Sequence, residues 1–251
     1  MGSVVSRDLK LEVRNSLSDS VVKKQLNREL FSGLARDYDA FTPLMSLWRD
    51  HYWKQKMVAM LPDVPAPVCV DIACGTGDII QSLAERYHRA NIVGIDLVMS
   101  MLEIAQTRRA ANGVSFVQQD MCNLGIQNNS ADILTAGYAI RNAPDLGKCL
   151  DEIYRVLKPD GIAAFLEFSK PQLWPFDVIS CWIMAMWGRV IGWLFHWRPE
   201  VCIYVGESLK AFPDRARLNE TMRQHGLEPV RSRLLMFGLG EILITRKRLR
   251  E

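Results

Sequence analysis

Short apolar runs alternate with segments of helical periodicity along the middle of the chain. Five runs, each short enough to be a buried strand of a parallel sheet, cover residues 68–73, 92–96, 114–117, 133–137 and 162–168. Between the last two, residues 146–157 place apolar side chains at i, i+3, i+4 and i+7 spacing, and Pro159 and Gly161 then end the helix. This alternation predicts an α/β fold with a doubly wound, mostly parallel sheet, whose ligands bind outside the carboxyl ends of the strands.

The two ends of the chain depart from this alternation. Residues 1–19 are expected to form a flexible arm, and residues 20–61 to form N-terminal cap helices with a break near Thr42 and Pro43. The proline-containing stretch 63–67 is a stiff connector to the first strand. Two more strands are expected at 231–237 and 241–246. We therefore expect one domain over 20–251, with a cofactor-binding core at 68–168, an apolar lid at 173–212, and a C-terminal helix and strands at 213–251.

The lid is expected from an unusually apolar stretch. Residues 173–197 hold five of the seven tryptophans. Asp177 and Arg189 interrupt the stretch, so it lacks the roughly 18 uninterrupted apolar residues that indicate a membrane span. We expect a helical lid over an apolar pocket, which could also rest on the bilayer surface, where tryptophan is favoured. A pair of ordinary core helices is the alternative.

Composition and charge narrow the classes of partner. The net charge of +3 is too small to argue for nucleic acid, and the basic run at 246–250 is either a solvated tail or a contact for anionic lipid head groups. The six cysteines form no CxxC pair, and no histidine stands at metal-ligand spacing to them, which favours a reducing compartment and no metal. The first twenty residues lack an apolar leader. A cytoplasmic protein is expected, with peripheral membrane contact left open and the oligomeric state undetermined.

The first candidate functional element is a glycine loop that follows the first predicted strand. It lies within the string DIACGTGD, which starts at Asp71. Gly75 and Gly77 allow backbone conformations that let a ligand approach closely. The helix that follows offers free N–H groups and its positive end to a carboxylate or a phosphate. The third glycine of a dinucleotide fingerprint is replaced by Ile80, and no lysine follows Gly77, so neither that fingerprint nor a P-loop is present.

Two carboxylates at later strand ends indicate which ligand the loop holds. Asp96 ends the second predicted strand, where it can accept both hydroxyls of a ribose. Asp120 follows the third strand and can accept an adenine amino proton, while Met121 packs against the ring. A nucleoside with an amino-acid tail fits this set, unless the acids merely cap the following helices. We expect S-adenosylmethionine, converted to S-adenosylhomocysteine, with Asp71, Thr76 and Gly137 as further cofactor-binding residues.

Several short strings accompany the DIACGTGD loop: Phe31-Ser32, Tyr38-Asp39 and Ile140-Arg141-Asn142. With these strings the chain resembles, from about residue 30 to residue 248, the UbiE-like ubiquinone/menaquinone biosynthesis C-methyltransferases. The resemblance continues in the strings YRVLKP and LEFSKP, of which the second is the most specific. The resemblance implies a Rossmann-like class I methyltransferase fold.

The departures from the family pattern fall mainly where the methyl acceptor is expected. Phe41 and Thr42 replace the last two residues of the pattern Y-D-x-M-N, Asp50 stands where the family has a histidine, and Gly137 replaces a serine. Asp160 replaces a glycine of the RVLKPGG string. The cofactor half of the chain is therefore closer to the family than the acceptor half.

The resemblance implies methylation of a ring carbon on a small hydrophobic phenol, a prenylated hydroquinone or demethylmenaquinol-type acceptor of quinone biosynthesis. Such a carbon is nucleophilic mainly when the adjacent hydroxyl is ionised. We expect Arg141 to stabilise the phenolate, Asn142 to orient a hydroxyl, Tyr38 to close the site and His51 to be a candidate base. Arg141 could instead pair with a carboxylate. An O-, N- or C-methyltransferase of another lipid or secondary metabolite, and a protein that binds the cofactor without turnover, remain as alternatives.

Overall fold

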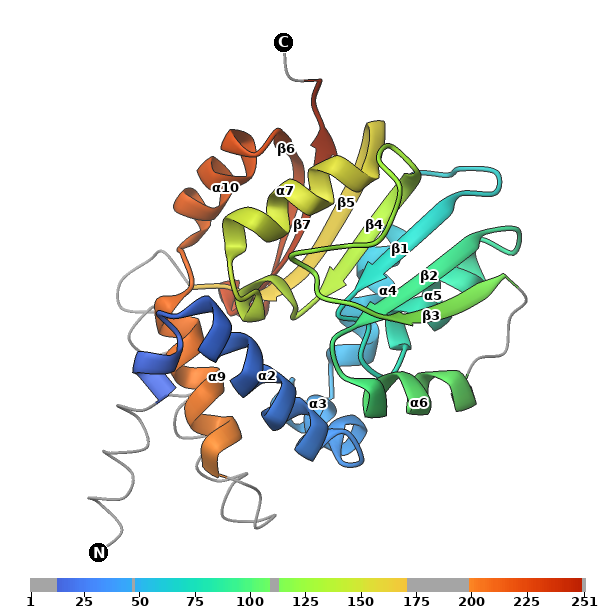
Figure 1. Cartoon of the computed structure of the whole chain (residues 1–251). Helices are drawn as coiled ribbons and strands as arrows, with labels where there is room; N and C mark the ends of the chain where they lie inside the picture. Colours follow the sequence, from blue (N-terminus) through green and yellow to red (C-terminus); the bar gives the residue numbers. More distant parts are fainter. Residues whose placement is uncertain (1–12, 47, 109–112, 171–198, 250–251) are drawn as a thin grey trace, which may run out of the picture.

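The computed structural model of the chain describes residues 13–46, 48–108, 113–170 and 199–249. Its centre is a seven-stranded sheet with the strand order β3-β2-β1-β4-β5-β7-β6 (Figure 1). Strands β1 to β5 are parallel, and β7 runs antiparallel to both of its neighbours. The predicted doubly wound, mostly parallel sheet is therefore confirmed. The strands are β1 (Val68–Ile72), β2 (Asn91–Asp96), β3 (Val114–Gln118), β4 (Ala131–Gly137), β5 (Leu157–Phe168), β6 (Leu227–Leu235) and β7 (Gly240–Lys247).

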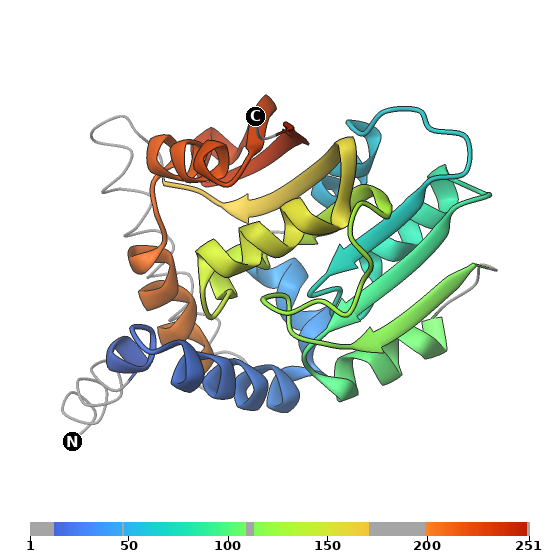
Figure 2. The ribbon, with the colours of Figure 1, turned by 45° about the horizontal axis from the view of Figure 1, so that its top comes forward.

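Helices cover both faces of the sheet and the edge where the parallel strands end (Figures 1 and 2). Helices α4 (Asp50–Ala59) and α5 (Asp78–Arg86) pack on one face, and α7 (Leu146–Val156) and α10 (Arg215–Gln224) pack on the other. Three helices lie together outside the carboxyl ends of the parallel strands. They are α2 (Ser20–Leu34), α3 (Tyr38–Met45) and α9 (Pro199–Ala211). Helix α6 (Met99–Arg108) follows β2, and the short 3₁₀ turns are Ile140–Asn142 and Met236–Gly238.

Each central strand contributes to two separate hydrophobic cores. Successive side chains of a strand point to opposite faces, so a run that is apolar throughout buries both. In β5, Ala163 and Phe165 pack in the core that contains residues of α7 and α10. Ile162, Ala164 and Leu166 pack in the core that contains residues of α4 and α5. This double burial explains why the strands read as continuous apolar runs.

Three parts of the chain differ from the prediction by more than two residues at an element boundary. Strand β5 begins at Leu157 rather than 162, because Leu157 already pairs with Ala131 of β4. Residues 158–161 have no partner in β4 and include a positive φ of 60° at Asp160, and the pairing resumes at Ile162. Strand β6 starts at Leu227 and ends at Leu235, since Met236 adopts a positive φ. Pro43 lies inside α3 instead of breaking it, and the helical stretch is interrupted after Leu34, where α2 ends, and after Met45, where α3 ends.

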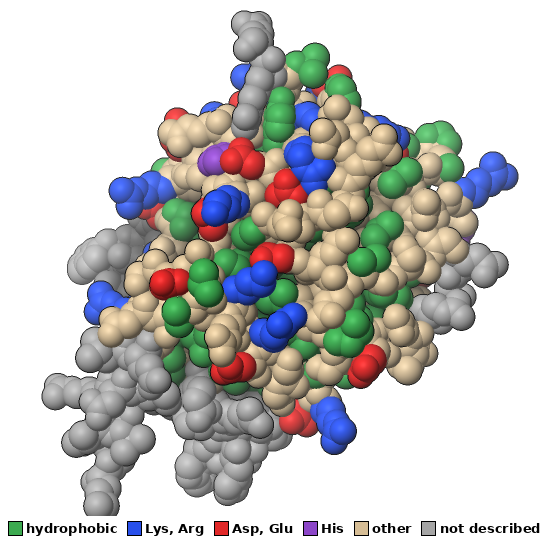
Figure 3. Space-filling view, viewed as in Figure 1, with side chains coloured by type: hydrophobic (Ala, Val, Ile, Leu, Met, Phe, Trp, Pro, Cys, Tyr) green, Lys and Arg blue, Asp and Glu red, His purple; other side chains and the backbone are tan. Residues whose placement is uncertain are grey.

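The ends of the chain are described in part. Of the arm expected at 1–19, residues 13–16 form a helical turn, Val13 is buried, and Asp19 caps α2 by accepting from Val21 N–H at 2.8 Å. The tryptophan-rich stretch 173–197 lies outside the described residues, and α9 is the described part of the expected lid. None of the described helices combines the length and the apolar character needed to cross a membrane. On the face shown in Figure 3, Lys and Arg side chains are interspersed with Asp and Glu.

Candidate active site

The glycine loop between β1 and α5 is held in place by Asp96 at the end of β2. Gly75 and Gly77 have φ values of 53° and 90°, a region that favours glycine. The N–H of Gly75 donates to Asp96 Oδ2 at 2.8 Å, and Val98 N–H donates to Asp96 Oδ1 at 2.9 Å. Burial raises the pKa of Asp96, and these backbone donors act in the opposite direction by stabilising its charge. The loop and the carboxylate are thus one unit.

A cavity lies beside this unit. Five of the predicted cofactor residues meet in its wall: Gly75, Asp96, Asp120, Met121 and Gly137. Helix α2 closes the cavity from the side opposite the strands. We refer to this space as the cofactor cavity.

Three predicted cofactor residues do not line the cofactor cavity. Asp71 is buried within β1, where its Oδ1 accepts a hydrogen bond from the Thr135 hydroxyl at 2.6 Å. The Thr76 hydroxyl donates to Asp39 Oδ1 at 2.8 Å, and a Cβ on Gly77 would lie 3.3 Å from Ala105 Cβ. None of the three lies in the wall of the cofactor cavity, so their contact with the cofactor stays a prediction.

Polar contacts fasten α2 across the cofactor cavity. Lys24 Nζ pairs with Asp120 Oδ2 at 2.7 Å, while Asp120 Oδ1 accepts from Cys122 N–H at 2.9 Å. Lys23 Nζ donates to the carbonyl oxygens of Arg141 and Ala143 at 3.2 and 2.6 Å. The predicted adenine acceptor Asp120 is thus also an anchor for α2.

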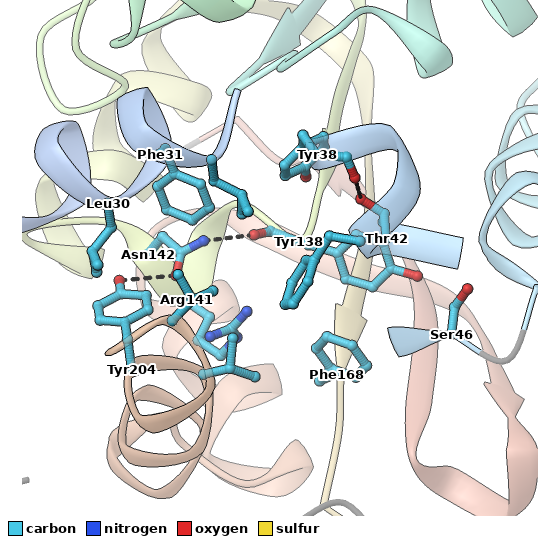
Figure 4. A pocket seen from close by; sticks show the side chains of 14 residues that line it. Leu30, Phe31, Tyr38, Thr42, Ser46, Tyr138, Arg141, Asn142, Phe168 and Tyr204 are labelled. Carbon is cyan, nitrogen blue, oxygen red and sulfur yellow. Dashed lines mark hydrogen bonds between the residues drawn. The ribbon is translucent and has the colours of Figure 1, made fainter. Parts of the chain in front are cut away.

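A second cavity, with about 650 Å³ of empty space, adjoins the first (Figure 4). We call it the acceptor cavity. The two cavities share four wall residues, Phe31, Tyr38, Tyr138 and Asn142. The remaining wall is mostly apolar, with Arg141, Thr42 and Ser46 as polar exceptions. Its apolar members are Leu30, Leu34, Phe41, Phe168, Val201 and Val205, and Tyr204 completes it.

Arg141 lines the acceptor cavity while it also pairs with a buried carboxylate. Its Nε lies 3.3 Å from Glu167 Oε1, and its Nη1 donates to the Ser208 hydroxyl. The guanidinium carbon is 5.7 Å from the centre of the Phe168 ring. Burial raises the pKa of Glu167, and the charge of Arg141 opposes that rise. The carboxylate pairing weighed as an alternative is thus present, and it fixes the guanidinium at the cavity wall.

Asn142 is held from three sides. Its Nδ2 donates to the Tyr138 carbonyl at 2.9 Å, and its Oδ1 accepts from the Tyr204 hydroxyl at 3.0 Å (Figure 4). The backbone carbonyl of Asn142 accepts from Asn27 Nδ2 at 2.6 Å. The ring of Tyr204 also meets Phe31 edge-on, with centroids 6.3 Å apart. Helices α2 and α9 are joined through this network, side by side in Figure 2.

Two tyrosines stand in the wall between the cavities. Burial is the main cause that raises the pKa of Tyr38 to about 12 and that of Tyr138 well above its usual range. Both phenols are therefore protonated at neutral pH and can donate hydrogen bonds. Tyr138 was not singled out from the sequence, although its place directly after Gly137 at the end of a predicted strand was an available signal.

The structure does not bring His51 to the site. His51 is exposed on α4 and lines neither cavity, so its expected role as a base has no geometric support. Tyr204 also lines the acceptor cavity but had no distinguishing sequence signal. Phe31, which belongs to the family resemblance, was not singled out as a site residue and lines both cavities. No group of three or more His, Cys, Asp or Glu that could hold a metal occurs in the described part of the chain.

The fold, the glycine loop and the paired carboxylates at strand ends define an S-adenosylmethionine-dependent methyltransferase. Residues 19–247 match the ubiE/COQ5 methyltransferase family, and the chain belongs to this family. It is 33% identical over 222 residues to the ubiquinone/menaquinone biosynthesis C-methyltransferase UbiE of Rubrivivax gelatinosus, covering 88% of this chain and 87% of the relative. It is 34% identical over 241 residues to the demethylmenaquinone methyltransferase of Deinococcus radiodurans, covering 94% and 99%.

Solved structures agree on the fold. A methyltransferase of Thermotoga maritima aligns with a TM-score of 0.62 at 18% identity, covering 88% of this chain and 99% of its own. An S-adenosylmethionine-dependent methyltransferase of Mesorhizobium loti aligns with a TM-score of 0.58 at 16% identity, covering 78% and 98%. The predicted fold class, family and cofactor are therefore confirmed.

Proposed function

We propose that the protein transfers a methyl group from S-adenosylmethionine to a ring carbon of a prenylated hydroquinone, a demethylmenaquinol-type acceptor of quinone biosynthesis. One observation carries the proposal: the cofactor cavity and an apolar cavity share a wall. A ring in the second cavity lies next to a ligand in the first, and direct transfer requires such proximity. The names of the two relatives support this acceptor class.

The residues of the cofactor cavity fit the cofactor chemically. Asp96 and Asp120 supply carboxylates at two strand ends, and Met101 and Met121 supply apolar surface for a base. Gly75 brings backbone close to the cavity without a side chain. In the proposal Asp96 holds the ribose hydroxyls, Asp120 and Met121 the adenine, and Gly75 and Gly137 the amino-acid tail. The cofactor, when bound, supplies a methyl group made electrophilic by a sulfonium.

The residues of the acceptor cavity bind and polarise the acceptor in this proposal. Phe41 and Val201 contact the ring and its tail, because burying apolar surface favours binding by about 25 cal/mol per Å². Arg141 stabilises negative charge on the acceptor oxygen, and Asn142 orients that oxygen. Tyr38 closes the shared wall and donates a hydrogen bond as a neutral phenol.

A product analysis tests the proposal directly. The purified protein is incubated with S-adenosylmethionine and a hydroquinone that carries one prenyl unit, and the product is examined by mass spectrometry and NMR. The expected product is heavier by about one CH₂ and carries the new methyl group on a ring carbon. An O-methylated product, or no transfer while the cofactor is bound, would contradict the proposal. Gly75→Val serves as the negative control.

A second candidate is a methyltransferase for a different lipid or secondary-metabolite acceptor. Phe41 and Thr42 both line the acceptor cavity and both depart from the family pattern, which is the observation in its favour. A panel of phenolic acceptors with and without prenyl tails separates the two candidates. Since a prenylated acceptor resides in a bilayer, the first candidate also includes peripheral membrane contact, which co-sedimentation with liposomes measures.

A further inference from the structure

Two buried polar atoms beside the acceptor cavity have no hydrogen-bond partner among the described residues. They are Asp50 Oδ1 and Tyr138 Oη, on side chains of residues only 3% and 9% exposed. Buried polar atoms are nearly always paired, so an unpaired acceptor and an unpaired hydroxyl in one region call for an explanation. Neither atom has a role in the methyl transfer proposed for the two cavities.

Asp50 and Tyr138 belong to the same corner of the site. Asp50 begins α4, and its N–H donates to Ser46 Oγ at 2.9 Å. Ser46 and Tyr138 both line the acceptor cavity, and in Figure 4 the Tyr138 ring lies between Asn142 and Ser46. After burial, the charge of Asp50 is the largest influence that raises the pKa of Tyr138, in agreement with this placement.

The other oxygen of Asp50 is firmly held. Lys54, one turn further along α4, places its Nζ 2.6 Å from Asp50 Oδ2 and 2.8 Å from Asp78 Oδ2. Burial alone would lower the pKa of Lys54, but the two carboxylates outweigh it and raise that pKa above its ordinary value. The charged Lys54 fixes Asp50 and leaves Oδ1 available.

We propose, on the basis of the proposed function, that Tyr138 and Asp50 form a proton relay that ionises the hydroxyl of the methyl acceptor. The acceptor's O–H bond breaks and its proton passes to Tyr138 Oη, while the proton of Tyr138 passes to Asp50 Oδ1. Asp50 becomes neutral, Tyr138 ends as it began, and the negative charge moves to the acceptor oxygen, opposite Arg141. When the methylated ring carbon has released its hydrogen to solvent as a proton, the proton on Asp50 returns along the same path.

The other ionisable groups around the pair do not take this role. Tyr38 is a neutral phenol, Lys54 is already protonated, Asp78 Oδ2 pairs with Lys54, and Glu167 is bound by Arg141. Tyr138, which lines both cavities, is the catalytic residue in the relay. Asp50 acts through it and is a positioning residue that also stores the proton.

Steady-state kinetics tests the relay against a purely structural role. Asp50→Asn and Tyr138→Phe are expected to lower kcat by roughly 10²–10⁴-fold, the usual contribution of acid–base catalysis, with KM changed less than about threefold. Asp50→Glu, which restores a carboxylate, should have a kcat at least about tenfold higher than that of Asp50→Asn. The matched controls are Asp63→Asn and Tyr52→Phe, both at exposed positions outside the site. A fall in kcat accompanied by a similar rise in KM and a lowered melting temperature, with no rescue by glutamate, would overturn the relay.

A binding measurement without cofactor gives a readout independent of turnover. The probe is 4-nitro-1-naphthol, whose neutral and ionised forms absorb at different wavelengths, at the pH where the free probe is half ionised. The wild-type protein should bind it mainly ionised, and Asp50→Asn should bind it mainly neutral. An equal ionised fraction in both proteins overturns the relay alone. Failure of the wild type to bind the probe overturns the proposed acceptor class, and the relay with it.

Discussion

Asp71 gives folding a pH dependence that one substitution should remove. Its side chain is fully buried in β1, with Oδ1 bonded to the Thr135 hydroxyl and Oδ2 unpartnered among the described residues. Burial raises its pKa from 3.8 to about 7, against the opposing effect of the Thr135 hydrogen bond. Asp71→Asn keeps the shape of the side chain and does not ionise. We therefore expect the variant to lose this part of the pH dependence.

The size and sign of the effect follow from proton linkage. Because the folded protein binds this proton more tightly than the unfolded chain, the stabilisation is fully present below pH 3.8 and is lost as the pH rises to about 7. From about pH 5 to about pH 8, roughly two pKa units at about 1.4 kcal/mol each give a loss of about 2.7 kcal/mol. Asp71→Asn should lack this loss, although other groups titrate in both proteins.

Urea unfolding of both proteins across this pH range measures the effect. The absolute stability of Asp71→Asn is a poor readout, since its Nδ2 becomes a buried donor without an acceptor and costs about 1–3 kcal/mol at every pH. The difference in slope between the proteins is the relevant quantity. Asp63→Asn, whose carboxylate is 99% exposed, is the matched control and should keep the wild-type slope. An Asp71→Asn variant that loses stability as steeply as the wild type would refute the reasoning.

Three further predictions concern the two cavities. Asp96→Ala should weaken S-adenosylmethionine binding by about 1–3 kcal/mol, because the ligand hydroxyls lose a charged acceptor; unchanged affinity in calorimetry would remove Asp96 from the site. Gly75→Val should abolish cofactor binding with the circular dichroism spectrum intact, because a β-branched residue resists a φ of 53° and its side chain would enter the cofactor cavity; retained binding would show that the loop does not hold the cofactor. Arg141→Gln should lower kcat by roughly 10²–10³-fold without weakening cofactor binding. A kcat within about twofold of the wild type would reduce Arg141 to a structural partner of Glu167.

The sheet was predictable because its signal is local. Double burial makes each parallel strand apolar throughout, and glycine or a carboxylate follows where the strand ends. Gly75, Asp96 and Asp120 were found in this way, since the carboxyl ends of parallel strands share one edge. The early start of β5 at Leu157 was not predictable, because Leu157 is separated from the apolar run at 162–168 by residues 158–161, which have no partner in β4 and include the positive φ of Asp160.

The acceptor side could be predicted only in part. Arg141 and Asn142 could be identified as candidates from the sequence because they follow the end of a predicted strand. On α4, adjacent residues point about 100° apart, and the sequence alone did not settle which face turns inward. The structure buries Asp50 and exposes His51, the residue that was expected to be the base. Tyr204 was also beyond sequence reasoning, since its contact with Asn27 spans 177 residues.

Helix α2 has a consequence for the kinetics of ligand exchange. It is anchored by Lys24 to Asp120, by Lys23 to two backbone carbonyls and by Asn27 to the chain at Asn142. Its Phe31 forms part of the wall of both cavities. A displacement of α2 that would free the spent cofactor would therefore also uncover the neighbouring ligand. If release proceeds in this way, the methylated product and the demethylated donor leave in one opening event, and the residence time of each depends on that of the other.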